Sequence, residues 1–162
     1  DHDRQRRWFA ALDEARDDLE SAGKIFNRLR DHLEAHAMAE EKYFYPTLLQ
    51  LGKGALDSDS ADETTEDAID DHNKIANAAD AALNEEVGSD AWWKCVDKAN
   101  YQNSAHLSEE ERQGLTDFRR RVPLERRIAL GIKYLAFEAD HVTNVEREEK
   151  DPDAYIEENE AA

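Results

Sequence analysis

The chain has 162 residues, of which 21 are Lys or Arg and 39 are Asp or Glu, so its formal net charge is −18. This length is enough for one domain with its own core, and the charge disfavours nucleic acid and anionic membranes, because phosphate groups would be repelled. A single cysteine excludes an intrachain disulfide, and neither a membrane-spanning stretch nor a secretory leader is recognisable, so we expect a cytoplasmic protein. The first residue is Asp1 rather than Met, which leaves open whether residues precede it.

Apolar residues recur every three or four positions along most of the chain, and glycine and proline are scarce, which predicts an all-α fold. Helices are expected over residues 2–20, 22–50, 65–86, 90–113 and 123–149. Pro46 is expected to kink the second helix or to end its regular part, and the Gly-, Ser- and Asp-rich segment 51–65 is expected to form a linker. The acidic tail after Pro152 is expected to fray.

The fifth helix is expected to open at Pro123 and to pack on the other four or extend them. Its apolar stripe consists of Leu124, Ile128, Ile132, Leu135, Ala139, Val142 and Val145. The first four helices form two pairs, and their stripes suit the near-antiparallel packing of a bundle. We therefore expect a bundle over residues 1–118, with the C-terminal helix and acidic tail, residues 119–162, packed on the same domain.

Five arginines lie within residues 119–127 of this otherwise acidic chain. They would either pair with surplus carboxylates of the same chain or dock an acidic partner, and the sequence does not choose between these. The oligomeric state is equally open.

Two triplets of potential metal ligands are related by a constant shift of 70 positions: His2, His36 and Glu40, then His72, His106 and Glu110. In each His-x-x-x-Glu pair the side chains share one helix face, about one turn apart, and that face is the apolar one. Burying such groups without partners would cost about 1–3 kcal/mol for each, and metal coordination would remove this cost. The alternative is a polar core satisfied by hydrogen bonds and water, which the repeat disfavours.

Six ligands are too many for one four-coordinate zinc site, so we expect two metals that share them, with the carboxylates as bridges. Nitrogen and oxygen ligands with open coordination positions suit iron, although manganese and zinc fit the same ligand chemistry. The open positions would accept solvent, dioxygen, peroxide or nitric oxide.

The order His, His-x-x-x-Glu, His, His-x-x-x-Glu resembles that of the hemerythrin-like family. The resemblance rests on residues 36–46 (HAMAEEKYFYP), residues 106–111 (HLSEEE) and the Asp-His pairs at 1–2 and 71–72, and it covers about residues 1–115. It implies an up-down-up-down four-helix bundle around two non-haem irons, bridged by carboxylates and an oxo or hydroxo group. It also implies two kinds of ligand. The terminal nitrogen ligands would be His2, His36, His72 and His106. The bridging carboxylates would be Glu40 and Glu110.

The chain departs from the oxygen-carrying members of that family at two places. In the third helix the oxygen carriers have a second His one turn after the first, and this chain has Ala76 at that position. In the fourth helix they have His-x-x-x-x-Asp, and this chain offers Glu110 or Glu111 in place of the Asp. We therefore expect a protein that binds dioxygen, nitric oxide or hydrogen peroxide rather than a carrier of the invertebrate kind. The alternatives are an iron-dependent, catalase-like enzyme that degrades peroxide, an iron sensor or metal-binding regulatory module, and an acidic helical module without metal.

Several neighbours of the repeat have an open role. His32, one turn before His36, is a fifth ligand, a hydrogen-bond partner of a ligand, or an interior His. Glu41 and Glu111 point about 100° away from the ligand face, so we expect solvation or salt bridging, with Glu111 as a possible substitute ligand. Tyr43 is expected to pack, and a hydrogen bond to a bound oxygen species is its alternative role.

Overall fold

The structure of the chain is a computed structural model that describes residues 1–55, 60–143, 145–146 and 149–160. Regular secondary structure in these ranges is entirely helical, with no strand, so the predicted all-α fold is confirmed. Across the same ranges, no helix has both the length and the apolar character needed to cross a membrane.

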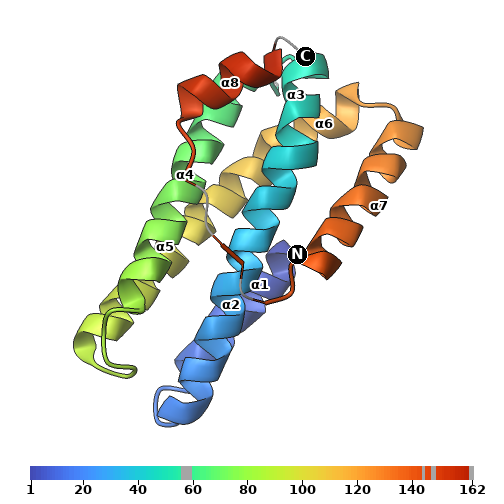
Figure 1. Cartoon of the computed structure of the whole chain (residues 1–162). Helices are drawn as coiled ribbons and strands as arrows, with labels where there is room; N and C mark the ends of the chain where they lie inside the picture. Colours follow the sequence, from blue (N-terminus) through green and yellow to red (C-terminus); the bar gives the residue numbers. More distant parts are fainter. Residues whose placement is uncertain (56–59, 144, 147–148, 161–162) are drawn as a thin grey trace.

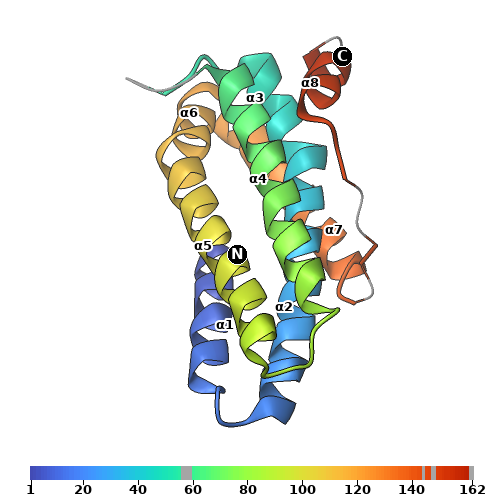
Figure 2. The ribbon, with the colours of Figure 1, turned by 90° about the vertical axis from the view of Figure 1, so that its left-hand side faces the viewer.

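Four long helices pack side by side along most of their length: α1 (His2–Glu14), α2 (Leu19–Ala39), α4 (Ala61–Ala82) and α5 (Asp90–Arg112). α1 pairs with α2 and α4 pairs with α5, as Figure 2 shows for the second pair. Side chains cap three of these helices: Asp18 for α2, Ser60 for α4 and Ser89 for α5 each accept from a backbone N–H of the first turn. The cap at Ser60 starts α4 four residues earlier than predicted. Residues 56–59 of the expected linker lie outside the described residues.

The second predicted helix continues through Pro46, and its regular α-helical part ends at Ala39, before the proline. It consists of α2, a π-helical turn η1 (Glu40–Phe44) and α3 (Tyr45–Leu51). The N–H of Tyr45 donates to the carbonyl of Glu40, five residues back, and Pro46 has no N–H to give to the carbonyl of residue 42. The wider turn thus absorbs the irregularity that proline imposes.

Two apolar clusters fill opposite ends of the bundle. One includes Phe9, Phe26, Leu29, Ile75, Trp92 and Val96, and the other includes Phe44, Tyr45, Leu48, Ile69, Phe118 and Val122. The segments between them, on all four long helices, carry the buried polar residues of the repeat. A polar layer therefore lies between two apolar cores that fix the positions of its helices.

Three further helices follow the bundle: α6 (Gly114–Arg121), α7 (Leu124–Asp140) and α8 (Pro152–Glu160). α7 lies against α2 and η1, and α8 crosses the ends of α3 and α4 (Figure 1). The predicted fifth helix thus ends at Asp140 rather than near residue 149, and the tail expected to fray contains α8. The domain division at residue 118 stays a prediction.

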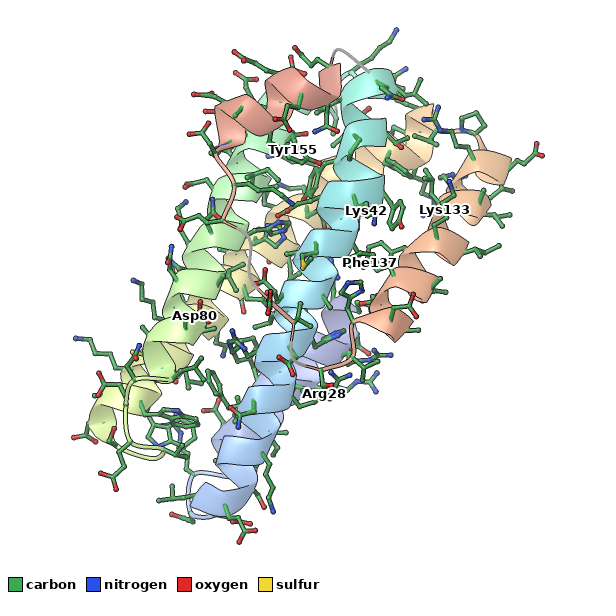
Figure 3. All side chains as sticks on the ribbon, in the orientation of Figure 1. Arg28, Lys42, Asp80, Lys133, Phe137 and Tyr155 are labelled. Carbon is green, nitrogen blue, oxygen red and sulfur yellow. The ribbon has the colours of Figure 1, made fainter. Side chains whose placement is uncertain are left out.

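The predicted packing stripe of α7 is wrong, because it lies on the outer face. Leu124, Ile128, Ile132 and Leu135 are each more than half exposed. The face turned to the bundle carries Leu130, Tyr134 and Phe137, which are half-buried. Figure 3 shows Phe137 on the side of α7 that faces Lys42 of η1, whose ammonium lies 4.9 Å from the ring centroid. α7 therefore has two apolar faces, and only one of them contacts the bundle.

Candidate metal centre

The structure brings all six residues of the repeat into the polar layer. His2 comes from the first turn of α1, His36 from α2, Glu40 from η1, His72 from α4, and His106 and Glu110 from α5. All are buried except His2, which is half-buried. Each long helix therefore contributes at least one side chain to a single cluster.

Glu40 lies at the centre of this cluster and divides it into two groups. One carboxylate oxygen, Oε1, lies 3.0 Å from Nε2 of His36 and 3.9 Å from Nε2 of His2. The other, Oε2, lies 3.3 Å from Nε2 of His72, which in turn lies 3.2 Å from Nε2 of His106. In both groups, His2–His36–Glu40 and Glu40–His72–His106, the candidate ligand atoms lie within 4.8 Å of one another. Glu40 thus presents one oxygen to each group, which is the arrangement of a bridging carboxylate.

Glu110 approaches the cluster from the opposite helix. Its Oε2 lies 3.0 Å from Nε2 of His2, and its Oε1 accepts a 2.9 Å hydrogen bond from the hydroxyl of Tyr45. Burial and the charges of Glu110 and Glu40 raise the pKa of Tyr45, so its hydroxyl keeps the proton that it donates. Tyr45 therefore fixes the orientation of the Glu110 carboxylate.

Three of the four imidazoles have a hydrogen-bond partner on Nδ1, the nitrogen that faces away from the cluster. Nδ1 of His2 lies 2.8 Å from Glu111, and Nδ1 of His72 lies 2.8 Å from Glu41. Nδ1 of His36 is hydrogen-bonded to the hydroxyl of Tyr134, on α7. A partner of this kind holds the proton on Nδ1 and leaves the lone pair of Nε2 directed at a metal.

The cluster fits metal ions better than it fits a hydrogen-bonded core. Nε2 of His36, Oε2 of Glu40 and Oε2 of Glu110 are buried and make no hydrogen bond of acceptable geometry with any residue that the structure describes. When two ligand atoms each lie about 2.1 Å from one metal and the ligand–metal–ligand angle is a right angle, the two atoms are about 3.0 Å apart. The separations of 3.0, 3.3 and 3.2 Å given above match that spacing.

A family model described as the hemerythrin HHE cation binding domain matches residues 1–118. The chain belongs to this hemerythrin family. Searches of the curated proteins and of the solved structures found no match to it. The family assignment confirms the resemblance drawn from the repeat and makes the chain a member of a cation-binding family, while the assignment of individual ligands stays a prediction.

In this hemerythrin domain the ligands compensate one another's charges when the protein is alone. Burial opposes the protonation of His2 and His72, but the surrounding carboxylates outweigh it and raise both pKa values to about 10. Burial alone would raise the pKa of Glu40, yet the charge on His36 and the contacts of the other imidazoles keep it well below its usual range. Burial and the charge on His72 lower the pKa of His106. Protons on His2 and His72 therefore offset the negative charges of the neighbouring carboxylates.

The two sides of the hemerythrin centre differ in the space beside them. A cavity of about 20 Å³ adjoins His72, His106 and His36 and is lined in part by Ala76, where oxygen carriers have a further His, and by Asn103. On the other side, an open pocket of about 320 Å³ reaches His2, His36 and Glu40 between the bundle and α7. Of these two spaces among the described residues, the second has room for more than a water molecule.

The neighbouring residues with an open role lie around the edge of this cluster. His32 is buried, with Nδ1 4.0 Å from Glu138, and neither of the two groups around Glu40 includes it. Glu111 contacts Nδ1 of His2 rather than the centre. Tyr43 packs edge-on against Phe137, with ring centroids 6.1 Å apart, as expected.

Three residues of the centre were missed by the sequence analysis. Glu41, expected to be solvated or salt-bridged, is paired with Lys150 but is buried, because the π-helical turn carries it inward beside Glu40. The repeat of Glu-Glu at 40–41 and 110–111 was the signal that could have found it. Tyr45 and Tyr134 had no such signal, since neither has a counterpart in the repeat.

Proposed function

We propose that the chain is a non-haem di-iron protein that binds a small diatomic molecule or a peroxide at this centre. The observation that carries the proposal is the placement of Glu40, which presents one oxygen to His36 and the other to His72. Two cations bound on either side of one carboxylate would neutralise the buried acid and satisfy the imidazoles at once.

The ligand set favours iron among the metals that bind nitrogen and oxygen. Four imidazoles and two carboxylates, divided between two ions, leave coordination positions open, which suits an exchangeable ligand rather than a closed structural site. His2 and His36 would hold one ion, His72 and His106 the other, with Glu40 and Glu110 between them. When bound, the two irons supply redox chemistry and the open positions at which a small molecule binds.

The protein side chains control access to the proposed centre. The 320 Å³ pocket gives a ligand a route to the His2–His36 side, whereas the 20 Å³ cavity leaves the His72–His106 side closed. Tyr45 orients Glu110, and Tyr134 orients His36. A small ligand would therefore exchange on the His36 side.

Metal analysis of the purified chain tests this function. We expect about two irons per chain, near-ultraviolet bands of a di-iron centre, and reversible spectral changes with nitric oxide or hydrogen peroxide. His36→Ala and His106→Ala should each lower the iron content to about one or less, because each removes a nitrogen ligand. His141→Ala is the matched control, since His141 is half-buried just after the end of α7 and contacts the carbonyl of Phe137.

Two results would overturn the proposal. One is a colourless protein without iron after growth in iron-replete medium. The other is an iron content in the His36→Ala and His106→Ala variants equal to that of the parent.

A further inference from the structure

The pocket on the His36 side is much larger than the ligands considered so far. A molecule of dioxygen or hydrogen peroxide is about the size of one or two waters, on the order of 30–60 Å³. The pocket encloses about 320 Å³, which lies within the range of roughly 300–1,000 Å³ for sites that bind small organic molecules. Its size therefore suits a ligand that carries an organic group.

The lining of the pocket has a polar end and an apolar body. His2, His36 and Glu40 form the end at the proposed metal centre. Apolar side chains from η1, α6 and α7 form much of the rest, together with the rings of Tyr43 and Tyr134 and the charged Asp1 and Arg127; the apolar ones are Phe44, Leu115, Phe118 and Leu130. A site of this kind orients a ligand through a few polar groups and holds it through apolar contact.

Gly131 of α7 keeps this pocket open. It lies in the middle of a 17-residue helix and lines the pocket, and a Cβ added there would meet nothing within 4 Å among the described residues. Glycine weakens a helix relative to alanine, so helix stability alone would favour a side chain at this position. The glycine leaves space in the pocket that a larger residue would take up.

Charge narrows the class of ligand. The chain has a net charge of −18, whereas the pocket itself is lined by charged residues of both signs, Asp1, Glu40 and Arg127. The field of the whole chain disfavours the approach of an anionic ligand from solvent, and it does not oppose a neutral one. A hydroperoxide is neutral near pH 7 and combines an organic body with the O–O group that the centre would bind.

We propose that the pocket between α7 and the bundle binds an organic hydroperoxide, with its apolar body along Leu130 and Gly131 and its O–O end toward His2, His36 and Glu40. The choice of a peroxide rests on the proposed function, whereas the pocket is a property of the protein itself. α7 lies beyond residues 1–118, so the specificity comes from a segment outside the family match.

Gly131→Phe fills the pocket, and Ala136→Phe is its matched control, because Ala136 is exposed on the same helix and does not line the pocket. The first measurement is the binding of 2-phenyl-2-propanol, the unreactive alcohol that corresponds to cumene hydroperoxide, to the chain without iron by ligand-observed NMR. We expect Gly131→Phe to weaken this binding at least about tenfold and Ala136→Phe to leave it within about twofold, at equal helicity and melting temperature. Equal binding in the parent and in Gly131→Phe overturns the inference.

The second measurement uses the iron-loaded chain and compares cumene hydroperoxide with hydrogen peroxide. For each variant we divide the rate of spectral change with cumene hydroperoxide by the rate with hydrogen peroxide. This ratio should fall at least about tenfold in Gly131→Phe and stay constant in Ala136→Phe. A chain that loads iron and responds to hydrogen peroxide with an unchanged ratio overturns the inference and supports the proposed function. A chain that takes up no iron, yet binds the alcohol in a Gly131-dependent manner, overturns the proposed function and supports the pocket.

Discussion

Replacing Tyr134 with Phe removes one hydroxyl group and tests whether α7 belongs to the metal centre. The hydroxyl is hydrogen-bonded to Nδ1 of His36 and lies 3.5 Å from the carbonyl oxygen of the same residue. Both contacts are satisfied when Nδ1–H of His36 donates to the phenol oxygen and the phenol donates to the carbonyl. In that arrangement Nε2 of His36 carries the lone pair that a metal needs.

The expected cost follows from the loss of this hydrogen bond. Without the hydroxyl, Nδ1–H of a buried imidazole has no partner, and the ring is free to take the other tautomer or to rotate. Removing such a partner of a ligating His typically weakens metal binding 10–100-fold, or about 1.4–2.7 kcal/mol. The loss should fall on one metal only, because His72 and His106 have no contact with Tyr134.

Titration of the metal-free chain with Co²⁺, followed by its visible absorption, measures the two binding steps separately. We expect the parent to bind two equivalents of Co²⁺. We expect Tyr134→Phe to bind one equivalent of Co²⁺ with the affinity of the parent and the second with an affinity 10–100-fold weaker. Tyr101→Phe is the control, since the side chain of Tyr101 is 77% exposed. The reasoning would be refuted if Tyr134→Phe bound both equivalents of Co²⁺ with the affinity of the parent, or if the affinities of both binding steps fell equally.

Two further predictions follow from the pKa shifts. His2 and His72, with pKa values of about 10, are protonated at pH 7.5 in the free protein and must lose their protons to bind metal, so metal binding should release about two protons per chain. Calorimetry in buffers of different ionisation enthalpy measures this number, which should decrease as the pH rises toward 10; a value near zero at pH 7.5 contradicts the prediction. Burial and the charges of His36, Arg4 and Arg28 lower the pKa of His32 to about 3. Below pH 6.5 the unfolded chain binds a proton at His32 that the folded chain does not, so the free energy of unfolding should fall by about 1 kcal/mol between pH 6.5 and 5.5. His32→Gln should remove that part of the slope in urea unfolding of the metal-free chain, and an unchanged slope argues against it.

The helices and the ligand repeat could be predicted because both depend on local spacing. Four residues place two side chains on the same face of an α-helix, so the inward direction of His36 with Glu40, and of His106 with Glu110, follows from the sequence. The same rule failed for Glu41, because η1 is wider than an α-helix and turns the next residue inward as well. Local spacing predicts contacts only where the helix keeps its regular period.

Local spacing does not predict contacts between residues that are far apart in sequence. Tyr134 is 98 positions from His36, and it reaches that residue only because α7 lies against α2. The sequence of α7 does not determine which side faces the bundle, since the helix has an apolar stripe on each of two faces. The stripe with Leu124 and Ile128 is the more regular one, and it is exposed. The bundle selects the other face through contacts of Tyr134 and Phe137 with His36 and η1.

The C-terminal segment makes the two halves of a repeated centre unequal. The repeat gives each half two imidazoles and a carboxylate, yet the partners of Nδ1 do not repeat: a neutral phenol contacts His36, whereas the carboxylate of Glu41 contacts His72. Glu41 is itself paired with Lys150, and its carbonyl accepts from Tyr155 of α8, whose side chain points inward in Figure 3. Each half has one imidazole with an anionic partner, because Nδ1 of His2 contacts Glu111, so the halves differ in the neutral phenol beside His36. Tyr134 and His36 also line the larger pocket, so in the proposed di-iron centre we expect a small ligand to exchange beside His36.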